Sequence, residues 1–166
     1  MYLWKVNNLI DDLRNDRITE KESMKYLVVT SVLYILGNDS YFTIGLEYSY
    51  LDTISTFLII AITIVGTLYC YSANNIGDNR DFIKRFFCLS LPVSIRLLVI
   101  VTPLAIVSAV LATEYWPEAF STAPLGETYK TDIWSVSLGV LVEVLFFWYV
   151  GYSIRKTSTP DIQSVN

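Results

Sequence analysis

Three long apolar runs with few charged residues constrain the fold of this chain more than any other feature. They extend from about Leu51 to Ala73, from about Ser94 to Thr113 and from about Ile133 to Ile154. An apolar stretch of roughly 18 residues or more is a candidate transmembrane helix, because a bilayer core about 30 Å thick needs about 20 residues of helix. The sequence therefore predicts an all-α integral membrane protein that binds the lipid bilayer directly.

A fourth, weaker span is expected between Thr19 and Gly37. The apolar run Tyr26–Leu36 is too short to cross a bilayer alone. However, Thr19-Glu20-Lys21-Glu22 has the pattern of a capping box, in which the first and last side chains bond the backbone N–H groups at a helix start. A helix that begins at Thr19 and reaches Gly37 would be about 27 Å long, which is just enough.

The distribution of Lys and Arg favours four spans over three. With four spans and both termini in the cytoplasm, eleven of the 12 basic residues lie inside and only Lys130 lies outside. With three spans, six lie on each side. Because short cytoplasmic loops are enriched in Lys and Arg, the better prediction is four spans in a bacterial inner membrane, with both termini inside.

The expected organisation is one membrane domain with short cytoplasmic attachments. Residues 1–18 should form an N-terminal amphipathic helix, because Val6, Ile10 and Leu13 recur at helical spacing. Residues 19–156 should form the transmembrane domain, and residues 157–166 a disordered cytoplasmic tail. The spans are expected at about 19–37, 51–73, 94–113 and 133–154.

A basic amphipathic segment precedes the third span. On a helical wheel, the apolar residues between Asp81 and Ser90 separate from the basic ones. We expect an interfacial helix here, with a first turn of the third span kinked at Pro92 as the alternative. Its candidate surface for a cytosolic protein partner consists of Arg80, Phe82, Lys84, Arg85 and Phe86.

Glu143 is the most informative polar residue, because it lies near the middle of the last span. A carboxylate at that depth costs roughly 2.5–3.5 kcal/mol on insertion scales, so it should face protein or water and have a partner. Arg96 is the candidate partner, unless its long side chain reaches the cytoplasmic surface instead. Glu143 is then either a proton or cation site or a structural lock between helices.

Small residues mark a candidate helix-packing face. Ser135 and Gly139 lie on the same helix face as Glu143, and Thr63 and Gly66 lie on a stripe of the second span. Such residues let helices approach closely within a membrane. Because little of the chain lies outside the bilayer, we also expect a homo-oligomer that gives Glu143 further partners.

Several classes of site lack the residues that they need. The chain has no histidine, and its two cysteines, Cys70 and Cys88, are too far apart for a metal motif and are expected as free thiols. It has no Gly-rich phosphate loop, no nucleophile–base set and no basic-aromatic patch. We therefore expect no enzyme activity, no catalytic residue, no cofactor, no metal site and no direct binding of nucleic acid.

In overall build, the chain resembles the compact four-span membrane subunits of bacterial anti-phage defence systems of the Kiwa type. The resemblance rests on length, topology and the cytoplasmic segments Trp4–Lys25 and Asp78–Arg96, and it carries over no functional residue. It implies a membrane sensor, anchor or effector that works with a cytosolic partner in antiviral defence. Small multidrug exporters match less well, because they are shorter and carry their Glu in the first span. An oligomeric cation channel and a small proton-coupled transporter, both using Glu143, remain the alternatives.

Overall fold

The computed structural model describes residues 2–37, 46–47, 50–115, 129–130 and 133–159, which are mostly helical. The short strands β1 (Leu46–Glu47) and β2 (Tyr129–Lys130) pair in parallel, with Leu46 opposite Tyr129. The prediction of an all-α fold is confirmed for these residues. The helices, in order, are α1 (Val6–Arg14), α2 (Glu20–Gly37), α3 (Tyr50–Asn75), α4 (Phe82–Tyr115) and α5 (Ile133–Ser158).

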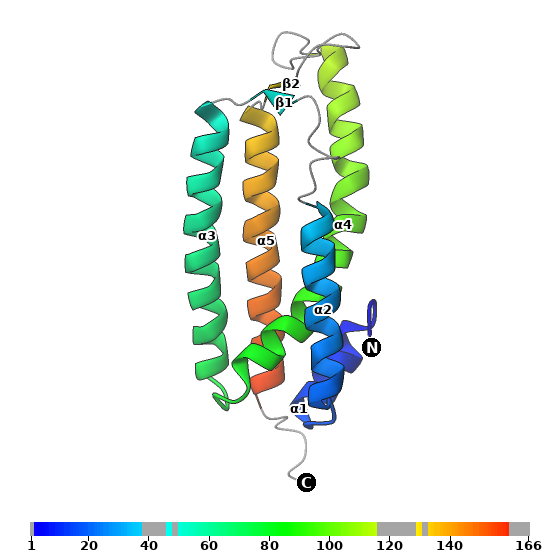
Figure 1. The fold of residues 1–166 in the computed structure, drawn as a ribbon, viewed down its shortest axis with the longest axis vertical. Helices are drawn as coiled ribbons and strands as arrows, with labels where there is room; N and C mark the ends of the chain where they lie inside the picture. Colours follow the sequence, from blue (N-terminus) through cyan, green and yellow to red (C-terminus); the bar gives the residue numbers. More distant parts are fainter. Residues whose placement is uncertain (1, 38–45, 48–49, 116–128, 131–132, 160–166) are drawn as a thin grey trace.

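The four long helices alternate in direction, so α1 and the last turns of α5 lie at the same end of the bundle, which we call the termini end (Figure 1). Helix α3 packs along α5, α5 packs against α4, and α4 packs against α2, while α1 packs on α4 and α5. Among the described residues, α2 makes no extensive contact with α3 or α5. The helices therefore form an open row in which α5 contacts three others.

Three of these helices are long and apolar enough to cross a membrane. They are α3, the Phe82–Val107 part of α4, and α5, and each of these segments has 26 residues. They correspond to the three plain apolar runs of the sequence. Helix α2 has the boundaries expected for the fourth span, but it is only 18 residues long and includes four charged residues near its start. The prediction of four spans is therefore confirmed for three of them.

The start of α2 is fixed by the capping box that the sequence predicts. The backbone N–H and the hydroxyl of Thr19 both donate to Glu22 Oε2, at 3.2 Å, and the backbone N–H of Glu22 donates to Thr19 Oγ1 at 3.3 Å. These reciprocal bonds satisfy N–H groups that a helix start leaves unpaired.

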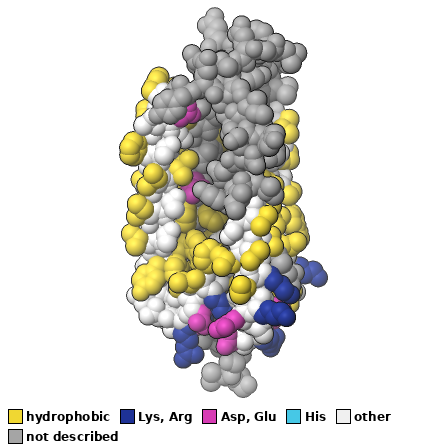
Figure 2. Space-filling view, in the orientation of Figure 1, with side chains coloured by type: hydrophobic (Ala, Val, Ile, Leu, Met, Phe, Trp, Pro, Cys, Tyr) yellow, Lys and Arg dark blue, Asp and Glu magenta, His cyan; other side chains and the backbone are white. Residues whose placement is uncertain are grey.

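The hydrophobic core lies at the termini end. The apolar face of α1, which includes Val6, Ile10 and Leu13, is buried there together with Val150 and Ile154 of α5. The N-terminal segment thus contains an amphipathic helix, which is shorter than the predicted 1–18 and packs under its own bundle. Figure 2 shows hydrophobic side chains over the middle of one face and charged ones near the termini end.

The expected break between an interfacial helix and the third span is wrong. One continuous helix, α4, begins at Phe82 rather than at Ser94, and Pro92 lies inside it. Proline removes one backbone hydrogen bond, which bends a helix without ending it when neighbouring residues are well packed. Residues 88–93 are buried, and the start of α4 runs obliquely across the foot of the bundle before the helix turns along it (Figure 1).

The expected start of the disordered tail is also wrong, because Thr157 and Ser158 are buried residues of α5. The hydroxyl of Thr157 donates to Ile154 O at 2.7 Å, and that of Ser158 donates to Ala73 O at 3.4 Å. Residues 160–166 of the expected tail lie outside the described residues.

Helices α3 and α5 interlock through two glycines, one on each helix. A Cβ atom at Gly66 of α3 would lie 2.2 Å from Cγ of Phe147, and a Cβ atom at Gly151 of α5 would lie 2.3 Å from Cε1 of Tyr69. Each aromatic ring therefore fills the notch left by the glycine of the other helix. Because small residues allow such approach and no hydrophobic effect operates within lipid, this packing stabilises the pair by direct van der Waals contact.

Substitution of Gly66 should destabilise the protein far more than substitution of Gly139. Gly66→Leu forces the ring of Phe147 out of its notch, which should cost at least about 1–3 kcal/mol. Gly139→Leu is the matched control, because nothing lies within 4 Å of its Cβ position. Thermal unfolding in mild detergent measures both. Equal melting temperatures for the two variants would contradict the interlock.

Candidate functional site

A buried guanidinium organises the turn between α3 and α4. Arg85 is 4% exposed, and its two terminal nitrogens donate to Asp78 Oδ1 at 2.5 Å and to Asp78 Oδ2 at 2.6 Å. The same side chain donates to Oδ1 of the buried Asn74 at 2.8 Å. A buried charge is tolerable only when paired and hydrogen-bonded, and this two-pronged geometry meets that requirement.

The end of α5 joins this arrangement. The backbone N–H of Asp78 donates to Ser158 O at 3.2 Å, and a Cβ atom at Gly77 would lie 2.4 Å from Cβ of Ser158. We call Asn74, Gly77, Asp78, Arg85 and Ser158 the basal cluster. It binds the end of α3, the start of α4 and the end of α5 into one unit.

The N-terminal segment is tied to the same end of the bundle by two long-range contacts. Arg14 donates to Lys156 O at 2.5 Å, which joins α1 to α5. Lys84 Nζ lies 2.7 Å from Asp16 Oδ1, which joins α4 to the turn after α1. These contacts and the basal cluster hold every charged segment at the termini end in a fixed relation.

The electrostatics of this end favour ionised carboxylates. The hydrogen bonds from Arg85 hold the pKa of Asp78 below its ordinary value. The hydrogen bond and the positive charge of Lys84 lower the pKa of Asp16 in the same way. In contrast, the bond that the Tyr2 hydroxyl donates to Asp12 at 2.7 Å raises the pKa of Tyr2.

The candidate partner surface is divided between internal and external roles. Arg85 is buried in the basal cluster, and Phe82 packs edge-on against Tyr71 with ring centroids 5.4 Å apart. The ring of Phe86 stacks on Phe147 at 6.5 Å. Lys84 is partly buried beside Asp16, so Arg80 is the one of the five that is fully exposed.

Arg96 is not paired with Glu143. Its Nη1 atom donates to the hydroxyl of Tyr149 at 2.6 Å, its Nη2 atom donates to the backbone carbonyl of Trp4, and its guanidinium lies 5.6 Å from the centre of the Trp4 ring. The guanidinium therefore reaches toward the termini end. This agrees with the alternative prediction, in which the long side chain of Arg96 extends to the membrane surface instead of pairing with Glu143. Contact with Trp4 combines a hydrogen bond with a cation–π interaction.

Glu143 lies instead in a small cleft between α4 and α5. Its Oε1 atom accepts a hydrogen bond from Thr63 Oγ1 of α3 at 3.3 Å. The cleft has a volume of about 290 Å³ and is otherwise mostly apolar, with Ser94 and Thr102 as its hydroxyl groups. The structure thus brings together two of the sequence-predicted residues, Thr63 and Glu143, and leaves room beside the carboxyl group.

The four residues of the candidate packing face lie in two different environments. Gly66 and Thr63 lie within the α3–α5 contact. Ser135 and Gly139 are exposed on the described surface, and nothing lies near the Cβ position of Gly139. Gly139 therefore has space for a neighbour from outside this chain.

Sequence reasoning missed several residues that organise the site. Asn74, Tyr149 and Phe147 were not among the predicted site residues, because only long-range packing brings them to Arg85, Arg96 and Gly66. Cys70 and Cys88 are free and buried, as expected, and Cys70 Sγ donates to Phe147 O at 3.5 Å. Among the residues that the structure describes, no three His, Cys, Asp or Glu side chains come together in a way that could hold a metal ion.

The pairing of Asp78 with Arg85 predicts loss of stability in acid. Because the folded pKa of Asp78 is below its unfolded value, the pairing stabilises the fold fully above the ordinary carboxyl range, and this contribution disappears as the pH falls through the folded pKa. Asp78→Asn should lower the melting temperature at neutral pH and flatten its fall between about pH 5 and pH 2. Asp11→Asn, an exposed control, should keep the wild-type pH dependence. A curve for Asp78→Asn parallel to that of the wild type would contradict the assignment.

Comparison with known proteins adds no relative. No protein-family model, curated protein or solved structure matches this chain. The membrane character rests on the three long apolar helices, and the candidate functional residues rest on their geometry: an exposed charged end organised by the basal cluster, and Glu143 in its cleft.

Proposed function

We propose that this protein is a four-span bacterial inner-membrane protein that acts as a homo-oligomeric sensor, anchor or effector together with a cytosolic partner. The observation that carries the proposal is the basal cluster, which joins three helix ends into a rigid unit at the charged end of the bundle. A rigid charged platform attached to membrane helices suits docking and signalling. Anti-phage defence is the process that the resemblance in overall build suggests.

The path of the chain supports a fourth crossing by α2. Helix α5 has 26 residues, so it is about 39 Å long and its two ends would lie on opposite sides of a bilayer core about 30 Å thick. Arg14 bonds the last turn of α5, whereas β1 pairs with β2 just before α5 begins. The chain between Arg14 and Leu46 therefore passes from one side to the other, and α2 lies in that interval.

The charges support a cytoplasmic position for the termini end. Every Lys and Arg side chain that the structure describes belongs to residues 5–25, 80–96 or 155–156, and basic side chains gather at this end in Figure 2. The positive-inside rule favours this end in the cytoplasm. Exposed residues here, such as Arg80 and Lys21, are then accessible to a cytosolic protein.

The exposed helix faces support self-association. In the most apolar 18-residue stretch of α3, and likewise in that of α5, only 11% of the stretch is buried within the protomer. On α5, Gly139 has open space around it, and the exposed Ser135 lies one turn before it on the same helix face. Lipid can cover such faces, but the open space at Gly139 fits close contact with a helix of a second copy.

Site-specific photocrosslinking in the native host tests both parts of this proposal. A photoreactive amino acid at Arg80 or Lys21 should capture the same cytosolic protein, and one at Ser135, on the helix face of Gly139, should capture a second copy of this chain. The control position is Ile64, an exposed residue within α3, which should capture neither. The proposal is wrong if Arg80 and Lys21 give no cytosolic adduct, or if Ile64 gives the same one.

A cation channel or proton-coupled transporter is the second candidate, favoured by the cleft around Glu143. If Glu143 carries a proton or cation, Glu143→Gln should preserve assembly and abolish flux in liposomes, because the amide keeps the shape without the titratable charge. If it is a structural lock, Glu143→Gln should be nearly silent, and Glu143→Leu should cost about 0.5–1.5 kcal/mol through its lost bond to Thr63. Size-exclusion profiles accompany both assays. A wild type without flux under any potential or pH gradient eliminates this candidate.

A further inference from the structure

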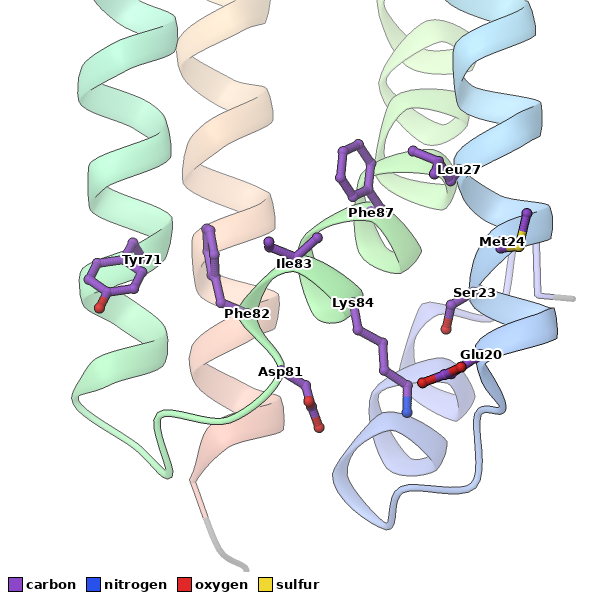
Figure 3. A pocket seen from close by; sticks show the side chains of 10 residues that line it. All are labelled: Glu20, Ser23, Met24, Leu27, Tyr71, Asp81, Phe82, Ile83, Lys84 and Phe87. Carbon is purple, nitrogen blue, oxygen red and sulfur yellow. The ribbon is translucent and has the colours of Figure 1, made fainter.

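Two of the cavities between the described helices have carboxyl groups in their walls, and they differ in whether a cation accompanies them. The larger cavity, of about 610 Å³, lies between α2 and α3. Figure 3 shows the ammonium of Lys84 in the space between the carboxyl groups of Glu20 and Asp81 in this pocket. The same ammonium lies 2.7 Å from Asp16 Oδ1. These acids therefore already share a cation.

The other carboxyl group, that of Glu143, has no such cation. No Lys or Arg side chain that the structure describes forms an ion pair with it, because these pairs all lie at the termini end. Glu143 lies about 15 Å along α5 from its start at Ile133, and so near the middle of a bilayer core about 30 Å thick. Its described hydrogen bond comes from the hydroxyl of Thr63. A charged carboxylate at this depth is costly without a counter-charge.

The cleft beside Glu143 is small, apolar and open at one side. Its volume of about 290 Å³ is near the lower limit of ligand pockets, which is roughly 300 Å³, so an occupant must be small. Leu97, Val101 and Val142 form apolar parts of its wall. Leu98 also lines it and is 68% exposed. In a membrane, the cleft therefore opens sideways to the hydrocarbon.

An aromatic ring shares this cleft with the carboxyl group. Phe146 follows Glu143 by three residues, which places both on one face of α5, and it lines the same cleft. The edge of its ring packs against Phe147, with ring centroids 5.1 Å apart and an interplanar angle of 76°. The face of an aromatic ring attracts a cation within roughly 6 Å of its centre. The cleft thus contains two groups that favour positive charge, and both are on α5.

The chemistry of the wall selects among cations. A small inorganic cation needs several oxygen ligands in place of its hydration shell, whereas the cleft has one carboxyl group and the hydroxyls of Ser94 and Thr102. A primary ammonium has three N–H donors, and burial of any that stays unpaired among apolar side chains costs free energy. A quaternary ammonium has no N–H to satisfy. Its alkyl groups suit apolar walls, and its charge suits a carboxylate and a ring face.

We propose that this cleft binds one small quaternary ammonium ion, with the charge between the Glu143 carboxylate and the face of the Phe146 ring and the alkyl groups against the apolar wall. The ion enters sideways past Leu98. This inference rests on the second candidate of the proposed function, because it names the class of cation that Glu143 would take.

Isothermal titration calorimetry of the full chain in a non-ionic detergent measures the binding of benzyltrimethylammonium. The wild type and the exposed control Asp11→Asn should bind it saturably and equally. Glu143→Gln should bind it at least about tenfold more weakly, since it loses the charge and keeps the shape. Phe146→Leu should bind it about fivefold more weakly, because it keeps an apolar wall without the ring. Size-exclusion profiles check that both variants remain folded.

A second probe tests the class of cation. Benzylammonium has the same ring and charge but three N–H donors, so it should bind the wild type more weakly than benzyltrimethylammonium. Three results would overturn the inference: unchanged affinity for benzyltrimethylammonium in Glu143→Gln, unchanged affinity in Phe146→Leu, or tighter binding of benzylammonium by the wild type.

Binding and flux together separate this inference from the function on which it rests. Saturable binding by a wild type that shows no flux in liposomes would support the quaternary ammonium site and eliminate the channel or transporter. Proton or cation flux that depends on Glu143, without saturable binding of benzyltrimethylammonium, would overturn the site and leave the channel or transporter standing.

Discussion

The contact between α3 and α5 is the interaction on which the rest of the structure depends. Phe147 fills the notch at Gly66, and Tyr69 fills the notch at Gly151, so the two helices can neither slide nor rotate without a clash. Farther toward the termini end, Ser158 meets Ala73 and Gly77 of the same α3 segment. The register of this pair places the end of α5 beside the turn into α4.

The polar structure at the termini end follows from that register. Arg85 can be buried only because Asn74 and Asp78 are held where its guanidinium needs them, and both positions depend on how α3 ends. Helix α1 then covers the apolar surface beneath α4 and α5 and brings Trp4 to Arg96. The chain is thus well packed at one end and open along its membrane helices.

Local signals in the sequence predicted the elements well. The lengths of α3 and α5, the capping box at Thr19 and the apolar face of α1 depend on residues close in sequence, and all are present in the structure. Whether Pro92 bends the helix or ends it was harder to predict, because the two cases differ only in how much packing surrounds the proline. Here the burial of residues 88–93 favours the continuous helix.

Pairings between distant residues were the part that the sequence could not provide. Arg96 and Glu143 have complementary charges, yet Trp4 and Tyr149 offer Arg96 partners nearer the polar end, where its guanidinium costs less to place. Similarly, Gly139 and Gly66 look alike in sequence, and only the structure distinguishes the glycine inside the α3–α5 contact from the one on the open surface. The role of Ser158 also depended on its contacts with a distant turn.

The orientation of the chain in the membrane is the most direct test of this account, because the fourth crossing and the cytoplasmic platform both depend on it. Reporter fusions in the native host, each inserted at one position of the full chain, measure it. Fusions after Gly77 and at the C-terminus should report the cytoplasm, and those near Asn38 and Thr122 should report the outside, although these last two positions lie outside the described residues. A fusion near Asn38 that reports the cytoplasm, or an N-terminus found outside, would contradict the four-span arrangement and the cytoplasmic platform with it.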